Sequence, residues 1–451
     1  MHIGLIIYGS LETMTGGYLY DRIVVQGLER SGHEVEVISL TSGWYLRRLF
    51  DGVWPSLCWR LLLRKFDLIL QDELCHPSLF LVNKRLRRLG GPPVVAIVHH
   101  IRCREPRPGW QNWLMALVER RYLASVDGFV FNSKTTEKTV TALVGNRQPR
   151  IIAYPAGDRF GSPLSPDTIR RRASQSGPLE LLFLGIIIPR KGLLPLLSAL
   201  ARVDCDLWRL TVVGGLDFDP AHTATVRQRI QRLGLTDAVR FIGPCSDAQL
   251  VKIMQTSHVF CMPYAYEGFG IAMLEAMAFG LPAIGCLDGA AAETISHGSN
   301  GYLLAPDDLA GLGALLVKLQ HDRQELLRLS LAARATYAGR PRWQDNVAAI
   351  NGFLLKMKGC QDQEESLKLF DRHPPKTPMK PYKCNKDRVS PAPMDGVGAG
   401  FDPRYLAAKK SIDDRALNRY VWTALCQALP QTTGAEPVNI LEIGAGIGTM
   451  L

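Results

Sequence analysis

The stretch EGFGIAMLEAMAFGLPAIG, residues 267–285, decides the fold class of this chain. It follows the apolar run HVFCMP, residues 258–263, and predicts a glycine-containing loop, a helix that begins near Gly270, and the start of another strand. Strand, helix and strand in this order indicate a parallel sheet with crossover helices. The first turn of such a helix carries unpaired N–H groups and a partial positive charge, and Gly268 and Gly270 leave them open to an anionic ligand.

Two glutamates bracket the start of this predicted helix. Glu267 stands just outside it, where a carboxylate can accept hydrogen bonds from sugar hydroxyls. Glu275 lies one to two turns inside, and helix geometry allows it to face the same side and accept from a ribose diol. The alternative is an exposed loop glutamate and a helix glutamate in a surface ion pair. The preceding apolar strand and the two glycines favour a binding site.

The same alternation of strands and helices recurs on both sides of a polar segment. Residues 161–178 are rich in Pro, Ser and Gly and predict a linker. The strand candidates before it are HIGLIIYG (2–9), EVEVISL (34–40), FDLILQ (66–71), PVVAIVHH (93–100) and GFVFNS (128–133). Those after it are LELLFLGI (179–186), WRLTVVGG (208–215), VRFIGP (239–244), HVFCMP and PAIGC (282–286). We therefore expect an α/β protein of two doubly wound parallel-sheet, Rossmann-like domains that face a cleft.

Several segments together resemble the GT-B glycosyltransferases of family four, also called glycosyltransferase group one. The resemblance covers about residues 1–358, and its motifs occur in the family's order. Besides residues 267–285, the motifs are MTGGYLYDRIVVQGLERSGHEVEVISL (14–40), AIVHH (96–100), FLGIIIPRKGLLPLL (183–197) and DGAAAETISHGSNGYLLAPDD (288–308). The resemblance implies an acceptor-side domain, residues 1–165, and a nucleotide-sugar donor-binding domain, residues 166–358.

The resemblance also implies roles for individual residues. Glu267, His99 and Lys191 are the expected catalytic residues. The expected donor-binding residues are Gly16, Gly17, Arg190, Lys191, Gly268, Phe269, Gly270 and Glu275. Basic groups can neutralise a diphosphate whose charge grows as its bond to the sugar breaks. Bare backbone at the two N-terminal glycines lets phosphate approach a helix N-terminus. Glu293 is expected to end the donor pocket.

Two positions leave alternatives open. Spacing favours His99 over His100 as the histidine near the reacting sugar, because His99 directly ends the apolar run. The family usually has Arg after the glycine of the strand that ends FLG, and here that position is Ile186. Arg190 is the candidate replacement for this phosphate contact. If it does not serve, donor affinity and activity are in doubt.

The composition limits the partners. The net charge of +11 favours anionic partners, but no nucleic-acid motif is present. No apolar run is long enough to span a bilayer, and no signal peptide precedes the first strand, so we expect a cytoplasmic protein. The basic, Trp-bearing stretch 42–66 resembles a peripheral membrane element at the inner membrane face; the alternative is a helix packed on the first domain.

We expect neither a metal nor a cofactor. The ten cysteines form no C-x-x-C pair and no cluster with histidine. The D-x-D strings 204–206 and 217–219 lack the surroundings that would indicate diphosphate-bound metal.

The C-terminal end has a different character. Residues 359–400 predict a flexible linker. Residues 401–451 end in VNILEIGAGIGTML, which resembles the first motif of class I methyltransferases that use S-adenosylmethionine, with Glu442, Gly444, Gly446 and Gly448 near the cofactor. One strand and half a turn cannot bury a core, so we expect this incomplete methyltransferase-like segment to be inert.

The expected activity is transfer of a sugar, with retention, from a UDP- or GDP-sugar to a hydroxyl of a glycan, lipid or small molecule, such as a cell-envelope polysaccharide. The alternatives are a GT-B nucleotide-sugar epimerase or phosphorylase, a nucleotide-sugar binding module with impaired catalysis, and a bifunctional glycosyl- and methyltransferase.

Overall fold

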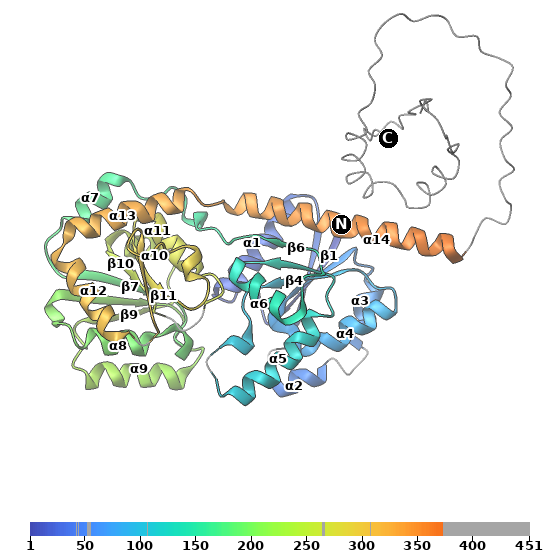
Figure 1. The fold of residues 1–451 in the computed structure, drawn as a ribbon, viewed down its shortest axis with the longest axis horizontal. Coiled ribbons are helices and arrows are strands. Elements are labelled where there is room, and N and C mark those ends of the chain that lie inside the picture. The colour runs from blue at the N-terminus through green and yellow to red at the C-terminus, as the bar shows by residue number, and fades with distance from the viewer. Residues whose placement is uncertain are drawn as a thin grey trace, which may run out of the picture. The chain divides into compact units, whose positions relative to one another are not determined.

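The computed structural model describes residues 1–372 except 42, 44, 52–55, 106, 264–266 and 307. Two six-stranded parallel sheets, each with helices on both sides, make up this part of the chain (Figure 1). The predicted fold class of two doubly wound domains is therefore confirmed. Within the described residues, no helix combines the length and the apolar character that a membrane span needs.

The first sheet has the strand order β2-β1-β3-β4-β5-β6. Its strands are β1 (His2–Tyr8), β2 (Glu34–Leu40), β3 (Leu68–Asp72), β4 (Val94–Val98), β5 (Gly128–Phe131) and β6 (Arg150–Ile152). Its α-helices are α1 (Gly16–Arg30), α2 (Tyr45–Asp51), α3 (Ser56–Leu63), α4 (His76–Arg88), α5 (Gly109–Leu123) and α6 (Lys134–Val144). Short 3-10 turns are η1 (Glu73–Cys75), η2 (Arg102–Arg104) and η3 (Asp158–Phe160).

Successive side chains of a strand point to opposite faces, and this alternation builds two separate cores around the first sheet. In β1, Ile6 and Tyr8 join the core beneath α3, α4 and α5. Ile3, Leu5 and Ile7 join the other core with α1. The sheet is buried on both faces, which explains why its central strands are continuously apolar rather than alternating.

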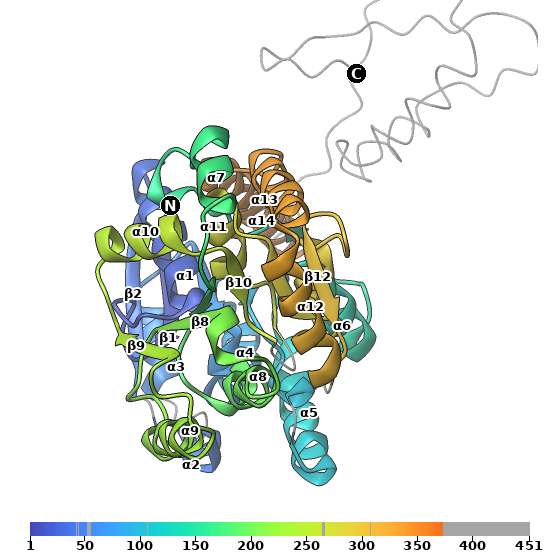
Figure 2. The same ribbon diagram turned by 90° about the vertical axis from the view of Figure 1, so that its left-hand side faces the viewer.

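The second sheet has the order β12-β11-β10-β7-β8-β9. Its strands are β7 (Leu179–Leu184), β8 (Trp208–Val213), β9 (Val239–Gly243), β10 (Val259–Cys261), β11 (Ala283–Cys286) and β12 (Gly301–Leu304). Its α-helices are α7 (Pro166–Ala173), α8 (Leu193–Leu200), α9 (Pro220–Arg232), α10 (Asp247–Thr256), α11 (Ile271–Ala278), α12 (Leu309–His321) and α13 (Arg323–Ala338). Its 3-10 turns are η4 (Pro189–Lys191), η5 (Cys205–Leu207) and η6 (Ala290–Glu293). Figure 2 views this domain from its outer side.

The segment 161–178, predicted as a linker, contains helix α7. Ser165 caps the helix by accepting a hydrogen bond from the Thr168 amide, and Pro166 occupies the first helical turn, where it lacks an N–H that would go unpaired anyway. Arg172 is buried and donates to the carbonyl of Gly280 at 2.7 Å. The polar composition of this segment therefore concealed a short helix that packs on the second domain.

The last helix, α14 (Trp343–Arg372), returns to the first domain, as its long course in Figure 1 shows. Its apolar side chains, among them Ile350 and Leu354, belong to the same core as α1. A Cβ atom on Gly27 of α1 would lie only 2.3 Å from Val347, so the two helices approach closely there. Residues 343–358, assigned from sequence to the second domain, thus pack on the first.

The last two predicted segments, 359–400 and 401–451, lie partly or wholly outside the described residues. Helix α14 continues to Arg372, so the first part of the segment predicted as a flexible linker, 359–400, is helical. The rest of that segment and the methyltransferase-like residues 401–451, with Glu442, Gly444, Gly446 and Gly448, lie outside the described residues.

Candidate active site

A cavity of about 740 Å³ lies between the two domains and is lined by residues of both. It collects the loops that follow the carboxyl ends of the parallel strands, where ligands of such sheets bind. The predicted site residues that line it are Gly16, Gly17, His99, Arg190, Lys191, Glu267, Phe269, Gly270 and Glu275. The structure thus brings together nearly all the residues that the sequence singled out from distant segments.

Gly268 is the predicted site residue that is not part of the cavity lining. A Cβ atom there would lie 1.9 Å from the carbonyl oxygen of His99, so this glycine instead allows the two domains to touch. The neighbouring Gly270 has φ 90° and directly precedes helix α11, a left-handed conformation that glycine adopts without strain. The helix begins directly after Gly270, as the sequence predicted, and the backbone turns at this glycine.

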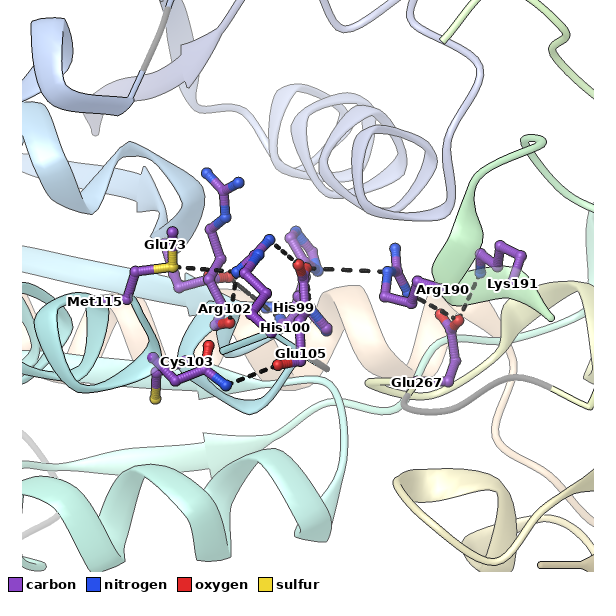
Figure 3. Close-up of polar contacts among 12 residues, drawn as sticks. Glu73, His99, His100, Arg102, Cys103, Glu105, Met115, Arg190, Lys191 and Glu267 are labelled. Atoms are coloured by element: carbon purple, nitrogen blue, oxygen red, sulfur yellow. Dashed lines mark hydrogen bonds and ion pairs between the residues drawn. The ribbon is translucent and has the colours of Figure 1, made fainter. Parts of the chain in front are cut away.

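Glu267 is held by the two basic residues that the sequence assigned to a diphosphate. Its carboxylate accepts from Lys191 Nζ at 2.5 Å and from an Arg190 guanidinium nitrogen at 3.3 Å (Figure 3). Burial alone would raise the pKa of Glu267, but Lys191 and Arg190 outweigh it and lower the pKa from 4.5 to about 2. The carboxylate is therefore ionised at neutral pH and sits beside two cations on one wall of the cavity.

Glu275 faces the same cavity from inside α11, and its side chain is almost fully buried. It forms an ion pair with Arg159, which also contacts Asp247 at 2.7 Å. Burial raises the pKa of Glu275, while Arg159 acts in the opposite direction. Arg159 lies in η3, just after the first sheet ends, and nothing in its local sequence distinguishes it from a surface arginine.

The two neighbouring histidines have different partners. His99 Nε2 lies 2.8 Å from Asp21, and this carboxylate outweighs burial and raises the pKa of His99. His100 Nε2 lies 2.6 Å from Glu105, yet burial, helped by the nearby Arg190, lowers the pKa of His100. Both line the cavity. The sequence preference for His99 stays a prediction, with Asp21 as a partner that the sequence did not reveal.

A buried carboxylate fixes the loop that carries both histidines. Glu73 Oε2 accepts from the backbone N–H groups of His99 and His100 at 3.3 and 3.2 Å (Figure 3). Glu119 accepts in the same way from the amides of Arg102 and Cys103 at 2.7 and 3.0 Å. The loop that follows β4 is thus positioned by hydrogen bonds from its backbone as well as by the side-chain contacts of its histidines.

The N-terminal glycines lie in the first turn of α1. The Thr15 side chain caps this helix by accepting from the Tyr18 amide at 3.4 Å. A Cβ atom on Gly17 would be 3.4 Å from the His99 ring, so the helix start and the histidine share one wall of the cavity. Ile186 lines the cavity as well and supplies no charge there.

Glu293 lies outside the cavity lining and has a different task from the one predicted. Its carboxylate accepts from the amides of Lys134 and Thr135, at 3.0 and 2.7 Å, and from the Thr135 hydroxyl at 2.6 Å. These groups form the start of α6, so a carboxylate of the second domain caps a helix of the first. A negative charge at a helix N-terminus is electrostatically favourable.

In the part of the chain that the structure describes, two groups of side chains have the composition of metal ligands. Glu73, His76 and Glu119 offer atoms within 4.8 Å of one another. The loop amides donate to Glu73 Oε2 and to both oxygens of Glu119, and His76 contacts Tyr45 at 3.0 Å, so these side chains hold the loop after β4. The exposed group 204–206 is a turn in which Asp204 accepts from the Asp206 amide. In the second D-x-D string, Asp219 caps α9.

Comparison with known proteins agrees with this geometry. Residues 166–336 match the model of the glycosyl transferases group 1, and residues 20–157 match the glycosyl transferase 4-like domain. The glycogen synthase of Mycobacterium tuberculosis is 26% identical over 299 residues, which cover 65% of this chain and 69% of that protein.

Solved structures support the fold. Sucrose-phosphate synthase from Thermosynechococcus elongatus superimposes with a TM-score of 0.68 at 20% identity, covering 79% of this chain and 99% of that one. Anabaena HepE, in complex with UDP and glucose, gives a TM-score of 0.63 at 20% identity and covers 78% and 99%. The chain thus contains a glycosyl transferase 4-like domain followed by a group 1 domain, and the protein is a glycosyltransferase of the GT-B fold.

Proposed function

We propose that this glycosyltransferase moves a sugar, with retention of anomeric configuration, from a UDP- or GDP-sugar to a hydroxyl of a glycan, lipid or small-molecule acceptor. The arrangement of Glu267, Lys191 and Arg190 on one wall of the interdomain cavity carries the proposal. It offers a carboxylate for sugar hydroxyls directly beside cations for a diphosphate. The complex of HepE with UDP and glucose supports a uridine donor, and GDP is the alternative.

The proposed reaction needs charge stabilisation more than proton transfer by the protein. The bond between the anomeric carbon and the phosphate oxygen breaks, and negative charge grows on the leaving diphosphate. Lys191 and Arg190, with the amides at the start of α11, stabilise this charge. The acceptor hydroxyl attacks from the same face and passes its proton to the departing phosphate. No metal or other cofactor is part of this proposal.

The remaining predicted residues complete the site in this proposal. Glu275 binds the ribose diol, which requires that it exchange part of its contact with Arg159. Phe269 and Gly270 border the sugar and phosphate, and Gly16 and Gly17 let the donor approach α1. His99 lies beside the reacting sugar in this proposal, and Asp21 raises the pKa of its ring.

The test measures nucleotide release from a panel of UDP- and GDP-sugars by the full chain and by Glu267→Gln. We expect one donor class to be turned over and the variant to lose at least about a hundredfold, the scale for removing one electrostatic contact to the transition state. Equal turnover by both proteins would contradict the role of Glu267. Epimerised free nucleotide-sugar would support an isomerase, and binding without turnover would support a binding module in which Ile186 has weakened the site.

We also propose that the enzyme works at the inner face of a membrane, as a peripheral protein of polysaccharide synthesis. In the stretch 42–66, helix α3 packs on the first domain through Leu57, Cys58 and Leu61, as the alternative expected. Phe50, Trp59 and Leu63 nevertheless expose 67%, 55% and 76% of their surface and are available for a membrane contact. A second exposed stripe lies on α5, and its members are Trp110, Trp113, Leu114 and Leu117. Trp and Leu beside basic residues suit the interface of an anionic bilayer.

Co-sedimentation with vesicles of anionic and of neutral phospholipid tests this contact. We expect the wild type to bind anionic vesicles and the double variant Trp110→Ser, Trp113→Ser to bind less. Leu355→Ser, which changes an exposed apolar residue of α14, is the matched control. Binding that is equal in all three proteins would remove α5 from the proposal.

A further inference from the structure

The first-domain wall of the cavity contains two arginines that the proposed donor site does not use. Arg48, from α2, and Arg102, from η2, both line the cavity. Among the described residues, neither guanidinium forms an ion pair with a carboxylate. The other arginines and the lysine of the lining do: Arg22 pairs with Glu12, Arg159 with Glu275, and Arg190 and Lys191 with Glu267.

Both guanidinium groups are held in place without neutralisation. Arg48 stacks on the Tyr8 ring at 3.8 Å, and its Nε is buried without a hydrogen-bond partner among the described residues. Arg102 lies over the Tyr45 ring at 5.6 Å. Aromatic stacking orients a guanidinium and leaves its N–H edge available for an anion.

Both arginines also lower the pKa of the same buried histidine. His76 lies beneath this wall, and burial, with added repulsion from Arg102 and Arg48, lowers its pKa to about 3. His76 is therefore neutral and contributes no charge of its own.

The acidic members of the lining on this side are Asp72 and Glu105. Burial together with Asp21 raises the pKa of Asp72 to about 7, whereas the contacts of Glu105 with His100 and Arg107 outweigh burial and lower its pKa to about 2. Glu105 forms ion pairs with His100, Arg107 and Arg190, and among the described residues it forms none with Arg48 or Arg102.

We propose that Arg48 and Arg102 form an anion subsite, so that the acceptor of the reaction carries a phosphate or carboxylate group. This inference rests on the proposed function, because it assigns the donor to the second domain and the acceptor to the first. Two guanidinium groups in a partly dehydrated cavity form strong charge-assisted hydrogen bonds with planar or tetrahedral oxyanions. A neutral sugar would leave both charges uncompensated.

The experiment titrates the UDP-saturated full chain with inorganic phosphate, glucose 6-phosphate, glucuronate and glucose in a calorimeter. We expect at least one of the three anions to bind about tenfold or more tightly than glucose, the scale of a hydrogen bond to a charged group. Phosphate and glucose 6-phosphate binding would indicate a phosphorylated acceptor, and glucuronate binding alone would indicate a uronic acid. Absence of saturable binding by all three anions would overturn the proposal.

Matched variants locate the subsite. Arg48→Gln and Arg102→Gln should each lose about tenfold in anion affinity, and Arg48→Lys should retain part of it. Arg47→Gln and Arg104→Gln change exposed neighbours on the same two elements and should leave anion affinity unchanged.

UDP affinity, measured in each protein, separates the possible failures. Absence of binding of both UDP and GDP by the wild type would contradict the proposed function, and if GDP alone binds, the anion titrations are made with GDP-saturated protein. Intact UDP binding with equal anion affinity in all variants would contradict the anion subsite alone.

Discussion

The ion pair of Glu267 with Lys191 predicts a stability difference that depends on pH. The Glu267 side chain is 16% exposed and lies 2.5 Å from the ammonium group. Lowering its pKa from 4.5 to about 2 corresponds to about 3 kcal/mol of stabilisation of the charged form in the folded protein. Because the folded-state pKa is the lower one, this contribution is fully present above pH 4.5 and is lost as the pH falls toward 2.

Urea unfolding of the wild type and of Glu267→Gln, at neutral pH and through the acid range, measures this contribution. We expect the variant to unfold with about 3 kcal/mol less free energy at neutral pH, and the difference to shrink as the wild-type carboxylate is protonated. Glu29→Gln, at an exposed position on α1, is the control and should show little difference at any pH. A difference for Glu267→Gln that is absent at neutral pH, or constant down to the acid limit, would refute the reasoning.

Three further changes test other contacts. Gly27→Ala should destabilise the protein by about 1–3 kcal/mol, because the added methyl group meets Val347 and separates α14 from α1. Thermal unfolding measures this loss, and an unchanged melting temperature would contradict the close packing of the two helices. Glu293→Ala should weaken the contact between the two domains at the start of α6 without altering the cavity. Small-angle scattering of the variant should therefore show a larger radius of gyration, and an identical radius would show that this cap does not hold the domains together. Asp21→Asn should lower the pKa of His99, as followed by NMR titration. In the wild type, the protonated His99 ring stabilises the fold at low pH, and this stabilisation is lost as the pH rises through the raised folded-state pKa. Asp21→Asn should remove this stabilisation. An unshifted titration of His99 would contradict the assignment.

The sequence predicted the architecture because local patterns determine it. Continuous apolar strands between amphipathic helices specify two parallel sheets, and the glycines at 268 and 270 specify the turn before α11. The predicted site residues follow the carboxyl ends of strands, and the topology alone carries these ends to one cleft. The family resemblance grouped Glu267, Lys191 and His99, and the topology explains why they meet.

The contacts that tune the site could not be predicted in the same way. Asp21 and Arg159 contact residues that are distant in the sequence. Asp21 lies 78 residues from its partner His99, and Arg159 lies 116 residues from its partner Glu275. Glu73 gave a usable signal, because two acidic residues directly follow the apolar strand 66–71, and a buried strand rarely ends in charge without a partner. Helix α14 misled the domain assignment, since its apolar face does not reveal which sheet it covers.

The return of α14 to the first domain has a mechanical consequence. The chain passes between the two domains twice, once after β6 and once between α13 and α14. We expect two tethers to favour rocking of the domains about a line through both crossings over rotation about other axes. Opening of the cleft would then follow one main hinge direction, and closure would return the loop of Gly268 to the carbonyl of His99.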